Sequence, residues 1–128
     1  MNIGVILKYV ALVLLVGLAG FVIWLAILNG SRGAKSRQVV RDATSIAAAL
    51  EYFYKDQNRY PAVNEFKDQN VMRQYLSNFP PREFASGVCD MSFEYANTFR
   101  DDYELRICLP KSVRGYRTGW NVIKSPAK

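Results

Sequence analysis

The pattern of hydrophobic and polar positions begins with an uncharged apolar block over residues 9–28, preceded by residues 1–8, which we predict to be a short N-terminal tail. About 20 apolar residues are what a helix needs to cross the roughly 30 Å hydrocarbon core of a bilayer. Tyr9 and Trp24 lie near the ends of the block, and amphipathic rings favour the headgroup region of a membrane. The block predicts a transmembrane helix, with a buried core helix as the less favoured alternative.

The second pattern, over residues 29–61, has the period of one helix face, because apolar residues return at alternating spacings of four and three. Gly30 and Gly33 each cost a helix about 1 kcal/mol relative to Ala, so the two helical parts are predicted to be either continuous or hinged there. Asn58 signals the end of the helix. The residues that we expect to pack on the rest of the chain are Val39, Ala43, Ile46, Leu50, Phe53, Tyr60 and Pro61.

The third pattern, within residues 62–128, predicts a small head with a three-stranded antiparallel sheet. Apolar and polar residues alternate over residues 92–96 and 103–109, and a third strand follows at residues 120–123. About five turn-forming residues separate the first two strands. A short helix is expected before the sheet, with its apolar residues Phe66, Val71, Tyr75 and Leu76 directed at the long helix. The predicted fold class is α+β, and a head this small should need the long helix as part of its core.

The two cysteines, Cys89 and Cys108, offer one covalent link in the head. Pairing Ala96 with Asp102 in the hairpin places Cys89 opposite residues near Cys108, which favours a disulfide over the alternative of two reduced core cysteines. Such a disulfide favours an oxidising compartment for the head. The basic residues that follow the apolar block favour the cytoplasm instead, because positive residues flanking a span stay inside. The residues alone leave the side of the membrane open.

The net charge of +6 directs attention to the C-terminal segment, where Arg114, Arg117 and Lys124 are candidates for binding an anionic partner. A solvated basic surface is the simpler interpretation. Basic residues mixed with Tyr116 and Trp120 are also typical of grooves for single-stranded nucleic acid, but core packing explains these rings equally well, so nucleic-acid binding is not favoured.

Candidate catalytic and metal-binding chemistry is sparse. The chain has no His, so neither a Ser-His-Asp triad nor an imidazole metal site can form. Asp101 and Asp102, with Asp90, could contribute to a Ca²⁺ site, but Ca²⁺ takes six to eight oxygen ligands, and ordinary turn acids are the favoured interpretation. We expect no catalytic residue, no metal and no cofactor.

The end of the predicted long helix, residues 50–61 (LEYFYKDQNRYP), resembles the type IV pilin and type II secretion pseudopilin superfamily. Members often end this helix with an aliphatic residue, aromatic residues, a short polar stretch and Tyr-Pro. Residues 73–80 (RQYLSNFP) are similar to the connector of that family, and the strands that follow match its C-terminal sheet. Cys89 and Cys108 resemble the disulfide that pins the C-terminal region of many pilins.

The resemblance implies a function and a place in the cell. It implies a non-enzymatic, single-pass component of a type IV pilus or of a type II secretion machine, with its head outside the cytoplasmic membrane. The implied partners are membrane lipid and other pilin-like subunits or membrane helices of such a machine. The alternative function is an anchored binding module that does not polymerise and whose basic head engages DNA or an envelope polysaccharide.

The sequence departs from the family near the N-terminus. Assembling members have a Gly cleavage site followed by an aromatic residue and then by a Glu, whose carboxylate lies in the membrane and helps to set the filament register. Here Gly4 is followed by Val5, and no acidic residue precedes Asp42. We therefore expect an uncleaved anchor, and we do not predict processing or assembly by that route.

Overall fold

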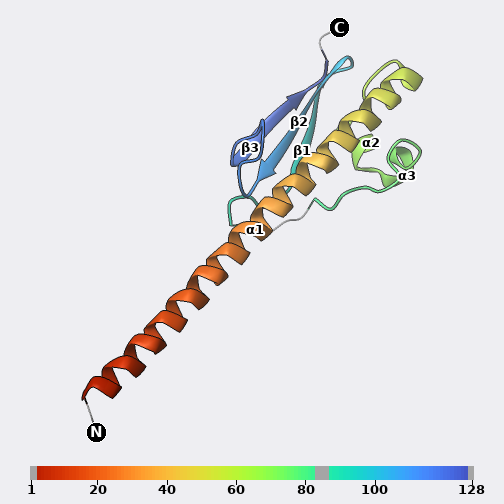
Figure 1. The fold of residues 1–128 in the computed structure, drawn as a ribbon. Helices are drawn as coiled ribbons and strands as arrows, with labels where there is room; N and C mark the ends of the chain where they lie inside the picture. The colour runs from red at the N-terminus through yellow and green to blue at the C-terminus, as the bar shows by residue number, and fades with distance from the viewer. Residues whose placement is uncertain (1–2, 83–86, 127–128) are drawn as a thin grey trace. The chain divides into compact units, whose positions relative to one another are not determined.

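The computed structural model describes residues 3–82 and 87–126 (Figure 1). Contacts between residues divide the chain into two units, Met1–Arg32 and Gly33–Lys128, and α1 contributes residues to both. A long apolar N-terminal helix and a small three-stranded antiparallel sheet confirm the predicted α+β class. The elements in order are α1 (Ile3–Gln57), α2 (Val63–Lys67), α3 (Gln69–Met72), β1 (Phe93–Phe99), β2 (Asp102–Leu109) and β3 (Gly119–Lys124).

The first unit consists of the apolar part of α1. The helix begins at Ile3, so the described part of the predicted tail is helical. None of the residues in its most apolar window is buried, and the mean hydropathy of that window is 2.8. This helix is long and apolar enough to cross a membrane, and its exposure does not fit the alternative of a buried core helix. The predicted hinge segment, residues 29–33, is helical.

The second unit contains the rest of α1, and the predicted stripe of this helix lies in the core. Leu50 and Ile46 are fully buried and join one apolar cluster with residues of α2, α3, β1 and β2. The helix ends at Gln57, where Asn58 takes a left-handed conformation (φ 53°) and its N–H donates to the carbonyl of Tyr54. Asn accepts this conformation more readily than most residues, so the predicted stop signal operates as expected.

The sheet has the strand order β1-β2-β3, and its strands cover the three predicted segments except that β1 begins at Phe93, one residue later than predicted. Alternate residues of β1 and β2 face the core, as the period of two requires. The predicted register was wrong: Ala96 pairs with Glu104, whereas Asp102 pairs with Phe99. Residues 98–99 extend β1 instead of forming a turn, and the ladder is irregular between Asn97 and Phe99. The connection is therefore a tight turn and not a five-residue loop.

The connector between α1 and the sheet forms two short helices where one was predicted. Asp68 separates them, because its side chain accepts a hydrogen bond from the backbone N–H of Asn70 (2.9 Å) and caps α3. Met72 is fully buried and was not among the predicted inward residues. Of those that were, Phe66 and Leu76 are buried, whereas Val71 and Tyr75 are half-buried.

Candidate functional site

The head is closed by a disulfide between Cys89 and Cys108, which confirms that prediction. The two Cα atoms are 6.1 Å apart, and both cysteines are buried. Cys108 lies on β2, and its N–H donates to the carbonyl of Ser92 (2.9 Å). The disulfide thus fixes the entry to β1 against the central strand.

The junction after α1 ties the helix end to the β1–β2 hairpin. Tyr60 is buried, and its hydroxyl donates to a carboxylate oxygen of Glu51 on α1 (2.6 Å), while its N–H donates to the carbonyl of Arg100 (2.8 Å). The carbonyl of Pro61 accepts from the hydroxyl of Tyr95 (2.7 Å). All seven residues predicted to pack between helix and head are buried in the structure: Val39, Ala43, Ile46, Leu50, Phe53, Tyr60 and Pro61.

An ion pair holds the other side of this junction. The guanidinium of Arg59 contacts both carboxylate oxygens of Glu65 at 2.6 and 2.7 Å, and the N–H of Ala62 donates to the same carboxylate (2.8 Å). These three hydrogen bonds favour the charged carboxylate and lower the pKa of Glu65 to about 2. The pair therefore stays charged at neutral pH.

The hydroxyls of Tyr60 and Tyr95 act as hydrogen-bond donors, and the raised pKa values of the buried tyrosines do not suit proton transfer at neutral pH. Burial raises the pKa of Tyr103 to about 12. Burial and the hydrogen bond to Glu51 also raise the pKa of Tyr60, and burial raises that of Tyr95. All three phenols are protonated at neutral pH, so they support the fold and supply no general base.

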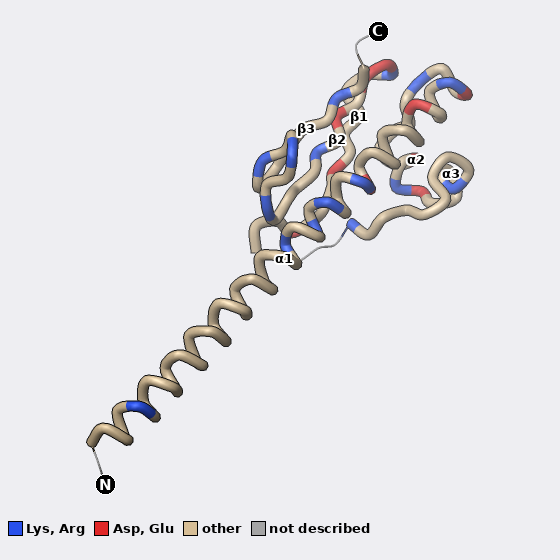
Figure 2. Tube along the Cα trace, in the orientation of Figure 1, with Lys and Arg blue, Asp and Glu red and all other residues tan. Residues whose placement is uncertain are grey.

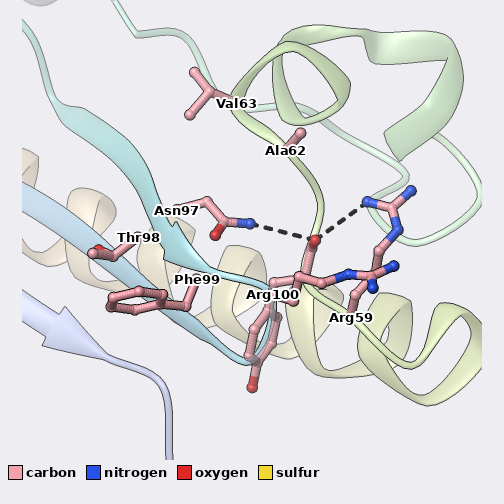
Figure 3. A pocket seen from close by; sticks show the side chains of 8 residues that line it. Arg59, Ala62, Val63, Asn97, Thr98, Phe99 and Arg100 are labelled. Carbon is pink, nitrogen blue, oxygen red and sulfur yellow. Dashed lines mark hydrogen bonds between the residues drawn. The ribbon is translucent and has the colours of Figure 1, made fainter.

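A cavity of about 550 Å³ lies beside the junction and is lined by residues from the α1–α2 connection and the β1–β2 hairpin (Figure 3). The carbonyl oxygen of Tyr60 accepts from both Arg59 and Asn97 at 3.4 Å, so these polar groups satisfy one another. The lining holds no carboxylate, thiol or imidazole, and it therefore lacks a nucleophile with an adjacent base. The lining residues are Arg59, Tyr60, Ala62, Val63, Asn97, Thr98, Phe99 and Arg100.

A basic surface lies at the end of the head where the β2–β3 loop meets α1. The N–H of Lys111 donates to the hydroxyl oxygen of the fully buried Ser36 (3.0 Å). A side chain at the buried Gly33 would meet the guanidinium of Arg37 at 3.6 Å and the Cδ atom of Lys111 at 4.0 Å. We define the basal cations as Arg37, Arg41, Lys111, Arg114 and Arg117, all of which are exposed.

The charges of the head are distributed unevenly, as Figure 2 shows. Blue segments of Lys and Arg mark α1 and the β2–β3 loop, whereas the β1–β2 turn carries acidic residues in red. Among the described residues, ion pairs join Arg59 to Glu65, Arg106 to Glu94 and Lys124 to Glu104, and none of them includes a basal cation.

The three residues predicted as a surface for an anionic partner do not come together. Arg114 and Arg117 lie in the β2–β3 loop, but Lys124 lies at the far end of β3 and pairs with Glu104 at 3.4 Å. The guanidinium of Arg106 lies over one face of the exposed Trp120 ring, 5.4 Å from the ring centre. Lys111 and Ser36 were not among the predicted site residues, although Ser36 precedes Val39 by three positions and so lies on the face of the predicted stripe.

The acidic residues considered for Ca²⁺ are also separated. Asp101 and Asp102 occupy the β1–β2 turn region, where Asp102 accepts a hydrogen bond from Ser125, whereas Asp90 precedes β1 near the disulfide. The described part of the chain contains no group of three or more His, Cys, Asp or Glu side chains placed to hold a metal ion.

Comparison with known proteins gives no assignment. No family model matches this chain, and neither a curated protein nor a solved structure matches it. What the structure itself defines is an α+β protein with a disulfide-closed head and, within the described residues, one helix long and apolar enough to cross a membrane.

Proposed function

We propose that this chain is a non-enzymatic, single-pass membrane protein of the pilin-like type, a structural or accessory subunit of a type IV pilus or of a type II secretion machine. The observation that carries the proposal is the change of environment along α1. Apolar side chains are exposed on every side of its first part, whereas a single stripe of its second part is buried in the head. One helix therefore serves both as the membrane anchor and as a wall of the core.

The head supports the same proposal through its Tyr-Pro junction. The resemblance to pilins rests on the segment that ends in Tyr60 and Pro61, and these residues make the backbone and side-chain bonds that hold the hairpin to the helix end. In this chain the Tyr-Pro ending therefore has a structural role, because its hydrogen bonds attach the end of α1 to the β1–β2 hairpin. The antiparallel sheet and the disulfide supply the other features that the resemblance implies.

The disulfide supports the proposed side of the membrane for the head. Disulfides persist in oxidising compartments and are rare in the cytosol. We therefore place the head of the anchored protein outside the cytoplasmic membrane, with the span in that membrane. The cavity beside the junction, with no carboxylate, thiol or imidazole in its lining, supports a structural and not a catalytic role.

The span would contact other helices through packing alone. Within a membrane, helices associate by close van der Waals contact and by polar groups, and no acidic residue precedes Asp42 in this chain. Contact with other subunits of such a machine would therefore depend on van der Waals packing between complementary helix surfaces. This weaker attachment suits an accessory subunit better than a filament core that relies on a buried carboxylate.

Site-specific photo-crosslinking in the protein's own cells tests the proposal. A crosslinking residue in place of Leu15, which is 70% exposed in the span, should give covalent products with pilin-like subunits or helices of the machine that survive high salt. The matched control places the same residue at the exposed Asn64 of α2, where these products should be absent. Adducts with lipid alone at Leu15 would contradict membership of a machine. Resistance of the head to protease added to spheroplasts would contradict its proposed side.

A further inference from the structure

We infer that the basal cations form a docking surface for anionic phospholipid headgroups of the bilayer that holds the chain, with phosphatidylglycerol as the probe. The inference rests on the membrane anchoring of the proposed function and adds a partner for the head. It begins with a contact between distant parts of the sequence, because Lys111 is hydrogen-bonded to Ser36 of α1.

The positive charges of Arg37 and Lys111 are not balanced by ion pairs within the described residues. The guanidinium of Arg37 and the apolar stem of Lys111 both approach Gly33, so side chains from α1 and from the β2–β3 loop lie side by side there. Neither forms an ion pair with any described residue. Asp42, an acidic residue nearby on α1, accepts a hydrogen bond from Gln38 (2.7 Å). A bound phosphate would gain attraction from cations that have no ion-pair partner among the described residues.

Hydrogen bonds order the backbone of the β2–β3 loop, which carries Arg114 and Arg117. The side chain of Asn121 accepts from the N–H of Arg117 (2.9 Å) and donates to its carbonyl (2.8 Å). Backbone hydrogen bonds in both directions link Val113 and Tyr116. The loop therefore holds its two arginines on a fixed backbone, so binding an anion costs little additional ordering.

The position of the basal cations along the chain favours lipid over a soluble anionic polymer as their partner. Arg37 is only nine residues beyond Leu28, the end of the predicted span, so the chain tethers Arg37 within about 30 Å of the bilayer that holds the span. Long basic side chains extend this reach, and the field of an anionic surface acts over about 8 Å at physiological salt. A groove for single-stranded nucleic acid uses aromatic faces for base stacking, and Arg106 occupies one face of the Trp120 ring.

The test uses the full chain in bilayers of phosphatidylcholine with about 30% phosphatidylglycerol, a composition chosen to give an anionic surface. Spin-labelled lipids report the preference of the protein for phosphatidylglycerol over phosphatidylcholine. Because each surface cation strengthens binding by about fivefold, we expect a preference of at least about fivefold at low salt. We expect it to vanish near 1 M salt, where the screening length is about 3 Å.

Two variants with equal charge locate the effect. The basal variant Arg37→Gln, Lys111→Gln, Arg114→Gln and Arg117→Gln should lose most of the preference. The distal variant Lys55→Gln, Lys67→Gln, Arg73→Gln and Arg100→Gln replaces exposed cations elsewhere on the head and should keep it. If the fourfold basal variant unfolds, the loop variant Arg114→Gln/Arg117→Gln provides the same comparison with α1 intact.

The outcomes separate the two proposals. Equal lipid preference in the basal and distal variants would overturn the docking surface. The docking surface would also be overturned, in favour of a polymer site, if the native chain showed no preference for phosphatidylglycerol but bound a single-stranded oligonucleotide that the basal variant did not bind. A chain that inserts stably but shows no lipid preference overturns only this inference, whereas release of the chain from vesicles by alkaline carbonate overturns the proposed function as well.

Discussion

The two parts of α1 have similar local backbone structure but opposite relations to their surroundings. Between Ile3 and Leu28 the large apolar side chains are 38% to 80% exposed. Beyond Gly33 the exposed positions are mostly polar or small, and the large apolar residues other than Tyr52 form a stripe that packs against the head. The comparison shows that the angular distribution of apolar residues, and not their number, decides whether a helix suits lipid or a protein core.

The sharpest way to probe this comparison is the same substitution in each part. Leu50→Ala should lower the free energy of unfolding of the head by about 2 to 5 kcal/mol, because Leu50 is fully buried and the change leaves a cavity. Leu15→Ala should leave that free energy unchanged. Urea unfolding in micelles, followed by circular dichroism of the tyrosines, measures both. Equal effects of the two substitutions would mean that the parts do not differ as described.

The disulfide should contribute the next largest effect, and only in the head. Replacing both Cys89 and Cys108 by Ala should lower the stability of the head by about 3 kcal/mol, because the link closes a loop across 19 positions. The helicity of the span in micelles should not change. Reduction of the native protein serves as the control and should give the same loss. A head as stable when reduced as when oxidised would contradict this prediction.

A smaller effect is expected at Ser36, a buried polar residue on the α1 face that packs against the head. Ser36→Ala removes the acceptor for the N–H of Lys111 and should cost about 1 to 2 kcal/mol, with faster hydrogen exchange at that amide. Ser45→Ala is the matched control on the same helix, because Ser45 is exposed and its hydroxyl only donates to the carbonyl of Arg41. Unchanged exchange at Lys111 in the Ser36 variant would show that this contact does not order the loop.

The smallest predicted effect is a pH dependence from the Arg59–Glu65 pair. The pKa of Glu65 is lowered from 4.5 to about 2 in the folded head, so its stabilisation is complete above pH 4.5 and is lost as the pH falls towards 2. Both side chains are partly exposed, so solvent screening limits the effect to about 1 kcal/mol. Glu65→Gln should remove this part of the acid dependence of the melting temperature. An identical acid profile in the variant would assign the dependence to other groups.

The sequence predicted the parts of the fold that depend on periodicity. The stripe from Val39 to Phe53, the strands and the disulfide follow from spacings of three to four, spacings of two and approximate strand pairing. The hairpin register does not, because Thr98 and Phe99 lie in a polar run typical of turns but remain in the β ladder. Gly33 and Ser36 extend the buried stripe by two positions that hydrophobicity does not mark.

The basic surface was harder to predict because it depends on contacts between distant segments. Arg114, Arg117 and Lys124 are close in sequence, yet a β-strand separates Lys124 from the other two and Glu104 pairs with it. Lys111 and Arg37 are far apart in sequence and meet over Gly33 only in the folded head. Sequence spacing within one strand or helix predicts a shared face, but it does not predict which loop will lie against which helix.

The most direct test of the account compares two fragments of the head. Residues 33–128 contain the buried stripe of α1, whereas residues 62–128 contain the sheet and connector without it. We predict a cooperative thermal transition for residues 33–128 and none for residues 62–128, because the shorter fragment lacks one wall of its core. A fragment of residues 62–128 that unfolds cooperatively with undiminished stability would contradict the central claim that α1 is part of the head.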